Sequence, residues 1–157
     1  MNEITNNENQ NPISNKSVNL KLKPMVATTS TKNNEEFEFS ESPSLEHLRS
    51  IQSKFVRDRN WNQFQTPRNL LLAMVNEVGE LAECFQWRGE VEQGLPDWND
   101  KDREHLGQEI SDVFIYLMRL AEECHIDLPV VAAAKIEQNK AKYPVEKFFG
   151  TSKKYNQ

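Results

Sequence analysis

A strongly apolar run that also carries regularly spaced glutamates constrains this chain more than any other feature. The run is LLLAMVNEVGELAECFQW, residues 70–87, and its apolar residues are typical of a helix that packs into a protein core. Glu77, Glu80 and Glu83 interrupt it three residues apart, so they share one face of that helix. Because burying an unpaired carboxylate is costly, a core helix that keeps them needs a compensating charge.

The rest of the chain after residue 38 also has helical periodicity, and no segment alternates polar and apolar residues as a strand does. A first helix is predicted over residues 44–58, and a second over residues 66–87. Thr66-Pro67 suits the start of the second helix, as an N-cap followed by a first-turn proline. A third helix is predicted over 99–124 and a fourth over 127–143. These segments predict an all-α fold, a four-helix bundle or a related helical packing.

The two ends of the chain are predicted to lie outside this helical domain. Residues 1–38 are rich in Asn, Ser, Thr and Lys and contain few apolar side chains. Such a segment buries too little surface to offset its ordering entropy, so it is predicted to be a disordered tail. Residues 39–150 are predicted to form one all-α domain, followed by a C-terminal tail over 151–157. The second and third helices are apolar nearly all round, which favours oligomerisation.

Charge and cysteine content limit the class of protein. The net charge of −5 argues against a binder of nucleic acid polymers. Cys84 and Cys124 both lie in apolar helical patterns, which fits free thiols in a reducing compartment. No run reaches the roughly 18 apolar residues of a membrane span, and no secretory signal is evident at the N-terminus. We therefore expect a soluble cytoplasmic protein without a membrane partner, with the nucleus or an organelle left open.

Two pairs of carboxylates are the candidate metal ligands. Glu77-x-x-Glu80 lies on the second predicted helix and Glu109-x-x-Asp112 on the third. If these helices are neighbours, four carboxylates converge, and their repulsion calls for a hard cation such as Mg²⁺ or Mn²⁺. A single E-x-x-E on a solvated face is commonplace, and that interpretation stays open for each pair. It is the preferred interpretation for Glu83, Glu90, Glu122 and Glu123.

Aromatic and polar residues near the pairs point to a nucleotide. Tyr116 follows Asp112 by four residues, Trp87 follows Glu80 by seven, and Trp61 precedes the second helix. A cation for phosphates beside rings for a base would suit a nucleotide, although each ring could equally be core. A polar stripe on the fourth helix could reach phosphates or simply be solvated; it consists of Lys135, Asn139 and Lys142.

Two other types of metal or phosphate site do not fit the sequence. A di-iron carboxylate bundle needs two E-x-x-H motifs, and the chain has only Glu122-x-x-His125. A P-loop needs G-x-x-x-x-G-K-[ST], which is absent. Cys84 is interpreted as structural, and His47, His105 and His125 as surface residues.

The carboxylate pattern resembles a known family. E-x-x-E, a gap of 28 residues and then E-x-x-D resembles the signature of the all-α, MazG-like nucleoside triphosphate pyrophosphatases. Within that group, three stretches resemble the dCTP pyrophosphatases: WNQFQTPRNLLLAMVNEVGELAECFQW, EISDVFIYL and DLPVVAAAKIEQNKAKYP. The similarity covers about residues 39–155.

The resemblance implies Mg²⁺-dependent hydrolysis of dCTP to dCMP and diphosphate by a homotetramer, with Mn²⁺ as an alternative ion. It extends to 5-modified dCTP and to a role in nucleotide-pool sanitation. It implies that Glu77, Glu80, Glu109 and Asp112 bind the metal, with Glu77 or Glu80 as general base. The residues implied to contact the nucleotide are Gln52, Trp61, Asn62, Gln63, Phe64, Gln65, Trp87 and Tyr116, with Lys135 and Asn139 of the same or another subunit at the phosphates.

The chain departs from the family pattern at two positions. Gln52 and Gln65 stand where animal members carry His, and glutamine cannot become cationic. Base preference is therefore less constrained than reaction type, and hydrolysis of dUTP or of many triphosphates is an alternative. A non-enzymatic helical scaffold with an acidic docking surface is a further alternative.

Overall fold

The computed structural model describes residues 37–154, and this part of the chain contains helices and no strand. The helices are α1 (Leu45–Asp58), α2 (Pro67–Gln86), α3 (Asp100–Glu123), α4 (Leu128–Lys142) and the short α5 (Val145–Phe148). The predicted all-α class is confirmed. Most of the predicted N-terminal tail and the last three residues lie outside the described residues, so the predicted domain boundaries stay predictions.

The four long helices begin where short polar side chains cap them. Each N-cap side chain accepts a hydrogen bond from the backbone N–H three residues later, which satisfies a donor with no intrahelical partner. These caps are Ser44, Thr66, Asn99 and Asp127. The predicted starts of the long helices are thus confirmed to within about one residue. Helix α5 was missed, because its four residues are too few to show a helical period.

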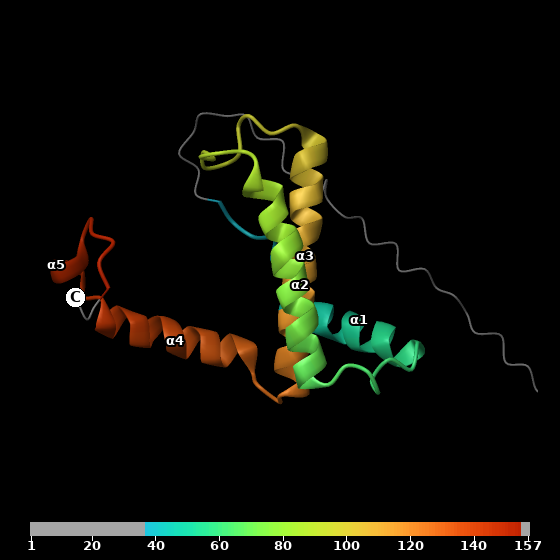
Figure 1. Ribbon diagram of the computed structural model, residues 1–157. Coiled ribbons are helices and arrows are strands. Elements are labelled where there is room, and N and C mark those ends of the chain that lie inside the picture. The colour runs from blue at the N-terminus through green and yellow to red at the C-terminus, as the bar shows by residue number, and fades with distance from the viewer. Residues whose placement is uncertain (1–36, 155–157) are drawn as a thin grey trace, which may run out of the picture.

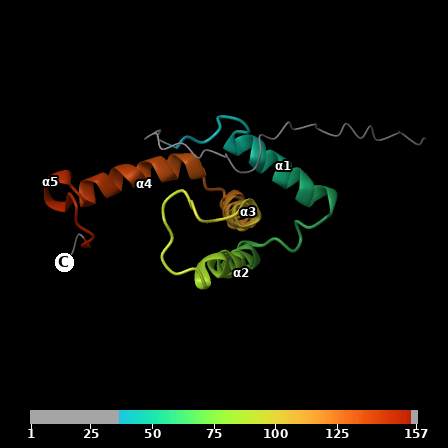
Figure 2. The same cartoon turned by 90° about the horizontal axis from the view of Figure 1, so that it is seen from above.

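Helices α2 and α3 form the structural centre of the chain. They run antiparallel and pack side by side, with α1 against the opposite side of α3 (Figures 1 and 2). Helix α4 leaves the end of α3 and extends away from this group (Figure 1). A single chain therefore has an open arrangement of helices in which α2 and α3 set the geometry.

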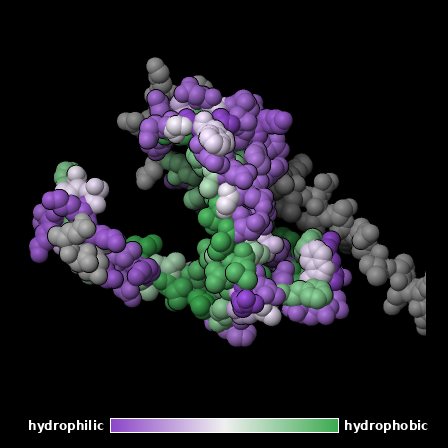
Figure 3. Space-filling view, viewed as in Figure 1, coloured by the Kyte–Doolittle hydropathy of each residue, from purple (hydrophilic) through white to green (hydrophobic). Residues whose placement is uncertain are grey.

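The core within one chain is small, and much apolar surface stays exposed. Among the described residues, the buried apolar side chains are Val56, Leu70, Trp98, Leu106, Met118 and Ala121. Most apolar residues of α2 and α4 are exposed instead, including Leu72, Val75, Val130 and Ile136. Figure 3 shows this apolar surface running along α2 and onto the start of α4.

None of the helices between residues 37 and 154 combines the length and hydropathy that a membrane crossing requires.

A charged network fastens α1 to α3. Glu122 of α3 accepts hydrogen bonds from Arg49 and Ser53 of α1 and from Arg119, one turn earlier on α3. Burial by itself raises the pKa of the Glu122 carboxyl, but the hydrogen bonds from Ser53 and Arg119, with Arg49, outweigh it and hold the pKa below its ordinary value. The interpretation of Glu122 as a solvated residue was therefore wrong. Two of its partners, Arg49 and Ser53, lie about seventy residues away in sequence, so no local pattern predicted them.

Replacing Glu122 should destabilise the fold. The Glu122→Gln variant removes one ionic partner of the buried Arg119. We expect it to lower the unfolding free energy by about 2 kcal/mol at pH 7. Because the native pKa is lowered, this stabilisation is present above pH 4.5, the ordinary value, and is lost as the pH falls through the native pKa. Urea unfolding of both proteins between pH 3 and pH 7 would measure it.

The matched control is Glu137→Gln, which removes a carboxylate from an exposed ion pair with Lys140 on α4. Exposed pairs contribute little, so this variant should unfold like the wild type. Equal stability of the two variants at pH 7 would contradict the structural role of Glu122.

Candidate active site

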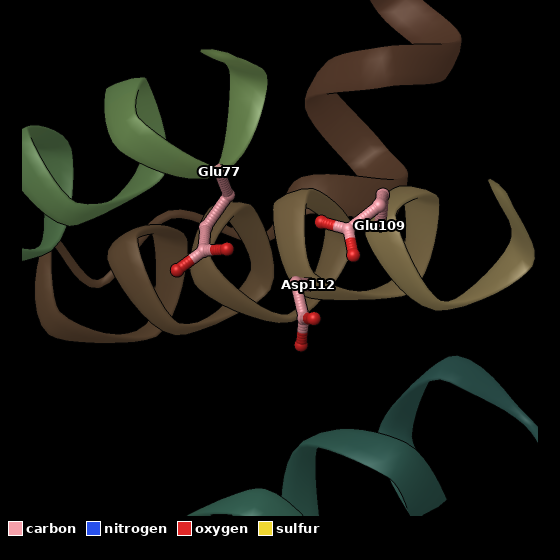
Figure 4. Close-up of side chains that lie close together, drawn as sticks. All are labelled: Glu77, Glu109 and Asp112. Atoms are coloured by element: carbon pink, nitrogen blue, oxygen red, sulfur yellow. The ribbon is translucent and has the colours of Figure 1, made fainter. Parts of the chain in front are cut away.

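Packing of α2 against α3 brings three carboxylates together. Glu77 projects from α2, and Glu109 and Asp112 project from successive turns of α3 toward it (Figure 4). One oxygen from each carboxylate lies within 4.8 Å of the others. The three-residue spacing on α3 puts both of its carboxylates on the face that meets α2. The predicted convergence of the two helices is thus present for these three residues.

Glu109 is the most enclosed of the three carboxylates. The residue is 9% exposed, and its Oε2 is a buried side-chain oxygen without a hydrogen-bond partner among the described residues. Its Oε1 lies 3.3 Å from Nδ1 of His105, one turn earlier on α3. A buried carboxylate oxygen rarely stays unpaired, so this atom fits a ligand from outside the described residues. A divalent cation, which prefers oxygen ligands, meets that requirement.

The charges in this group act on one another. Burial raises the pKa of Glu77 above its ordinary value, and the neighbouring carboxylates Glu80, Asp112 and Glu109 raise it further. Burial also raises the pKa of the Tyr116 hydroxyl, with smaller contributions from Glu77 and Asp112. The negative charges of the carboxylates therefore act on both Glu77 and Tyr116.

Glu80 is oriented differently from the other predicted ligands. It lies one turn beyond Glu77 on α2, but its Oε1 accepts a hydrogen bond of 2.6 Å from Nδ2 of Asn76. The group of three carboxylates does not include it. The role of Glu80 as a fourth ligand stays a prediction.

The predicted nucleotide-contacting residues are spread over several helices and loops. The segment 61–65 joins α1 to α2, and within it the Trp61 ring packs edge-on against Phe55 with centroids 5.7 Å apart. Tyr116 is half-buried beside the carboxylates, whereas Trp87 follows the end of α2 and is 87% exposed. The remaining predicted contacts from α1 and the loop are the half-buried Gln52 and Gln65 and the exposed Asn62, Gln63 and Phe64.

Lys135 and Asn139 lie apart from the carboxylates. Both are exposed on α4, which extends away from α2 and α3 (Figures 1 and 2). A single chain therefore does not bring them to the three carboxylates, and their place at the phosphates stays a prediction.

Sequence reasoning missed two residues that contact the predicted site. His105 was interpreted as a surface residue, and it is exposed, but its ring also contacts Glu109; the four-residue spacing on one helix was the available signal. Arg119 is buried and donates hydrogen bonds to the side chains of Gln65 and Asn62. No local pattern predicts that contact, since it joins segments more than fifty residues apart.

The MazG-like family model matches residues 72–157, which include α2 from its second turn onward and all of α3 and α4. The chain belongs to the MazG-like family. It is 49% identical over 119 residues to dCTP pyrophosphatase 1 of Rattus norvegicus, covering 76% of this chain and 70% of that protein. It is 46% identical over 121 residues to dCTP pyrophosphatase 1 of Homo sapiens, covering 77% and 71%.

A solved structure agrees with the family assignment. The chain is 30% identical to a pyrophosphatase from Archaeoglobus fulgidus, with a TM-score of 0.59. The match covers 70% of this chain and 99% of the archaeal one. The helical arrangement shared with the archaeal pyrophosphatase thus accounts for most of the described residues.

Stability without metal should reveal the cost of ionising Glu77, which burial and the neighbouring carboxylates impose. Because the native pKa of this acid is raised, its ionisation opposes folding, so stability falls as the pH rises from 4.5, the ordinary value, through the native pKa. We expect the Glu77→Gln variant of this MazG-like chain to show a smaller fall and a higher Tm at pH 7 in EDTA. Thermal melts between pH 4 and pH 7.5 would measure the difference.

Glu83→Gln provides the control, because Glu83 is an exposed glutamate of the same helix outside the carboxylate group. It should follow the wild-type profile. A Glu77→Gln profile indistinguishable from that of Glu83→Gln would show that ionising Glu77 carries no such cost.

Proposed function

We propose that this chain hydrolyses dCTP to dCMP and diphosphate in a reaction that requires Mg²⁺, with Mn²⁺ as an alternative ion. The observation that carries the proposal is the buried Oε2 of Glu109, which lies among three converging carboxylates and has no hydrogen-bond partner in residues 37–154. Identities of 46% to 49% to dCTP pyrophosphatases support the choice of substrate. The proposal extends to 5-modified dCTP and to sanitation of the nucleotide pool.

Glu77, Glu109 and Asp112 would hold the cation, with Glu80 as the fourth ligand from the next turn of α2. When bound, the ion neutralises phosphate oxygens and lowers the pKa of water. Burial and the neighbouring carboxylates raise the pKa of Glu77 above its ordinary value, which is the direction that suits a group taking a proton from the attacking water. Glu80, in contact with Asn76, is the other candidate general base. With either base, the oxygen of the attacking water would bond to the α-phosphorus. The bond from that phosphorus to the bridging oxygen would break, and diphosphate would leave.

The nucleotide itself would be held by groups around the carboxylates. The segment 61–65, Gln52 and Trp87 are proposed to surround the base, and Tyr116 to contact the sugar or base beside the metal. Lys135 and Asn139 are proposed to meet the phosphates from another copy of the chain. Their exposure on a helix that extends away from its own site supports that arrangement.

We further propose that the chain assembles as a homotetramer. Apolar residues along α2 and α4 are exposed in one chain, and such continuous surface is typical of protein interfaces. Covering it with a second copy would also enlarge a core that is small for a domain of this length.

Removing the buried carboxylate charge should abolish turnover. In Glu109→Gln we expect dCTP hydrolysis with Mg²⁺ to fall at least about 100-fold, because a neutral amide is a weak ligand for a hard cation. Helix content, measured by circular dichroism, should not change. Glu104→Gln, at an exposed position on the same helix, should retain full activity. Turnover by Glu109→Gln at the wild-type rate would overturn the proposed metal site.

A substrate panel separates the proposal from its alternatives. Diphosphate release from dCTP, dUTP, dATP and CTP would be compared at equal concentration with Mg²⁺. The proposal predicts the highest kcat/KM for dCTP. Equal values across the panel would favour a broad-specificity enzyme, and no release from any triphosphate would favour the helical scaffold.

The oligomeric state is open to a direct measurement. Light scattering coupled to size exclusion should give a mass four times the 18.3 kDa of one chain. A lysine in place of Val75 or Ile136, both exposed in the single chain, should lower that mass if either lies in the interface. A wild-type mass of one chain would contradict the assembly.

A further inference from the structure

The buried guanidinium of Arg119 holds two amide side chains of the segment 61–65. Its side chain is 5% exposed. Nε donates to Oε1 of Gln65 at 2.9 Å, and Nη2 donates to Oδ1 of Asn62 at 3.2 Å. The same guanidinium lies 2.6 Å from Glu122 and 2.5 Å from Glu123. These two carboxylates neutralise the guanidinium, and its planar fork fixes the direction of each bond.

This contact determines which end of each amide faces outward. A guanidinium has five N–H donors and no acceptor, so an amide bonded to it must present its oxygen. The NH₂ groups of Gln65 and Asn62 are therefore turned away from Arg119. Neither NH₂ group has a hydrogen-bond partner within residues 37–154. Two fixed donors are thus left available on the segment that joins α1 to α2.

A fixed donor that meets ring position 3 distinguishes the two pyrimidine bases. Cytosine has acceptors at both N3 and O2, whereas uracil carries a hydrogen on N3 and is a donor there. A fixed NH₂ group can bond to N3 of cytosine, but it meets N3–H of uracil donor to donor. An amide that is free to turn could present its oxygen to uracil instead, and the distinction would be lost. A buried donor left facing a donor is the kind of mismatch that gives selectivity between similar substrates.

We propose that Arg119 is a positioning residue that holds the Gln65 and Asn62 amides as outward donors, and that this orientation makes the site prefer cytosine nucleotides over uracil nucleotides. The inference rests on the proposed function, in which residues 61–65 line the nucleotide pocket. It assigns base preference in this chain to a residue that touches neither the base nor the metal. It also explains how neutral glutamine at position 65 can select a base without becoming cationic.

The sharpest test replaces Gln65 with a side chain of the same shape that cannot donate. In Gln65→Glu the carboxylate still accepts from Arg119, but the outward NH₂ group is gone. We expect the ratio of kcat/KM for dCTP to that for dUTP to fall about tenfold in the full chain with Mg²⁺. The added negative charge repels both triphosphates alike and cancels in this ratio. The control is Gln93→Glu, at an exposed loop position, and it should keep the wild-type ratio.

A second variant tests Arg119 itself. The ammonium of Arg119→Lys lacks the planar fork, so the amides can turn. We expect the ratio to fall, mainly through a higher KM for dCTP with kcat retained. Adding Gln65→Glu to this variant should change the ratio little further, because both substitutions remove the same orientation.

The outcomes separate the inference from the proposed function. If the wild type prefers dCTP and Gln65→Glu keeps that preference, the inference is wrong and the function stands. A loss of activity on both nucleotides by the same factor, in either variant, would likewise leave Arg119 with a purely structural role. If the wild type cleaves no dCTP, the proposed function fails and the inference fails with it. Gln65→Glu decides the matter alone if Arg119→Lys does not fold, since it leaves the buried arginine in place.

Discussion

The packing of α2 against α3 brings carboxylates close together, and their mutual repulsion is the constraint on which the proposed site depends. This packing holds Glu77, Glu109 and Asp112 with oxygens within 4.8 Å of one another, and no cationic side chain of the described residues forms a close ion pair with Glu77 or Asp112. Glu122, on the same helix, is also enclosed, but Arg49 and Arg119 compensate it and its pKa is lowered. The pKa of Glu77 is raised instead. Opposite shifts in residues of one type separate a carboxylate that arginines compensate from one that the described residues leave uncompensated.

Helix α3 takes part in two separate groups of charged side chains. The network around Glu122 and Arg119 fastens α1 and the segment 61–65 to α3. The three carboxylates come from α2 and α3, which pack side by side. Helix α3 therefore carries both the proposed metal ligands and the residue that orients the proposed base pocket. The proposed metal site therefore depends on the packing of α3 against α2, and the proposed base preference depends on the contact of α3 with the segment 61–65.

Much of this was predictable from the sequence, because the relevant signals are local. Ser44, Thr66, Asn99 and Asp127 each cap a helix within three residues of themselves, so the helix starts followed from short patterns. The spacing within Glu109-x-x-Asp112 places both carboxylates on one face of a helix regardless of the rest of the fold. The convergence with Glu77 needed the added assumption that the two helices are neighbours, which the structure bears out.

The rest could not be predicted, because it depends on contacts between distant segments. Arg119 meets Gln65 across 54 residues and Asn62 across 57. The compensation of Glu122 by Arg49 spans 73 residues, and so it was taken for a solvated glutamate. Helix α4 departs from the other helices after a short turn, and no local pattern in the sequence gives the direction of that departure.

The central claim is that the carboxylates on α2 and α3 form a binding site for a divalent cation. Titration of the full chain with Mn²⁺, followed by the electron paramagnetic resonance signal of the free ion, tests it without requiring turnover. The wild type should remove Mn²⁺ from solution, and a variant with Glu109→Gln and Asp112→Asn together should bind at least about tenfold more weakly. Equal Mn²⁺ binding by the two proteins would contradict the claim.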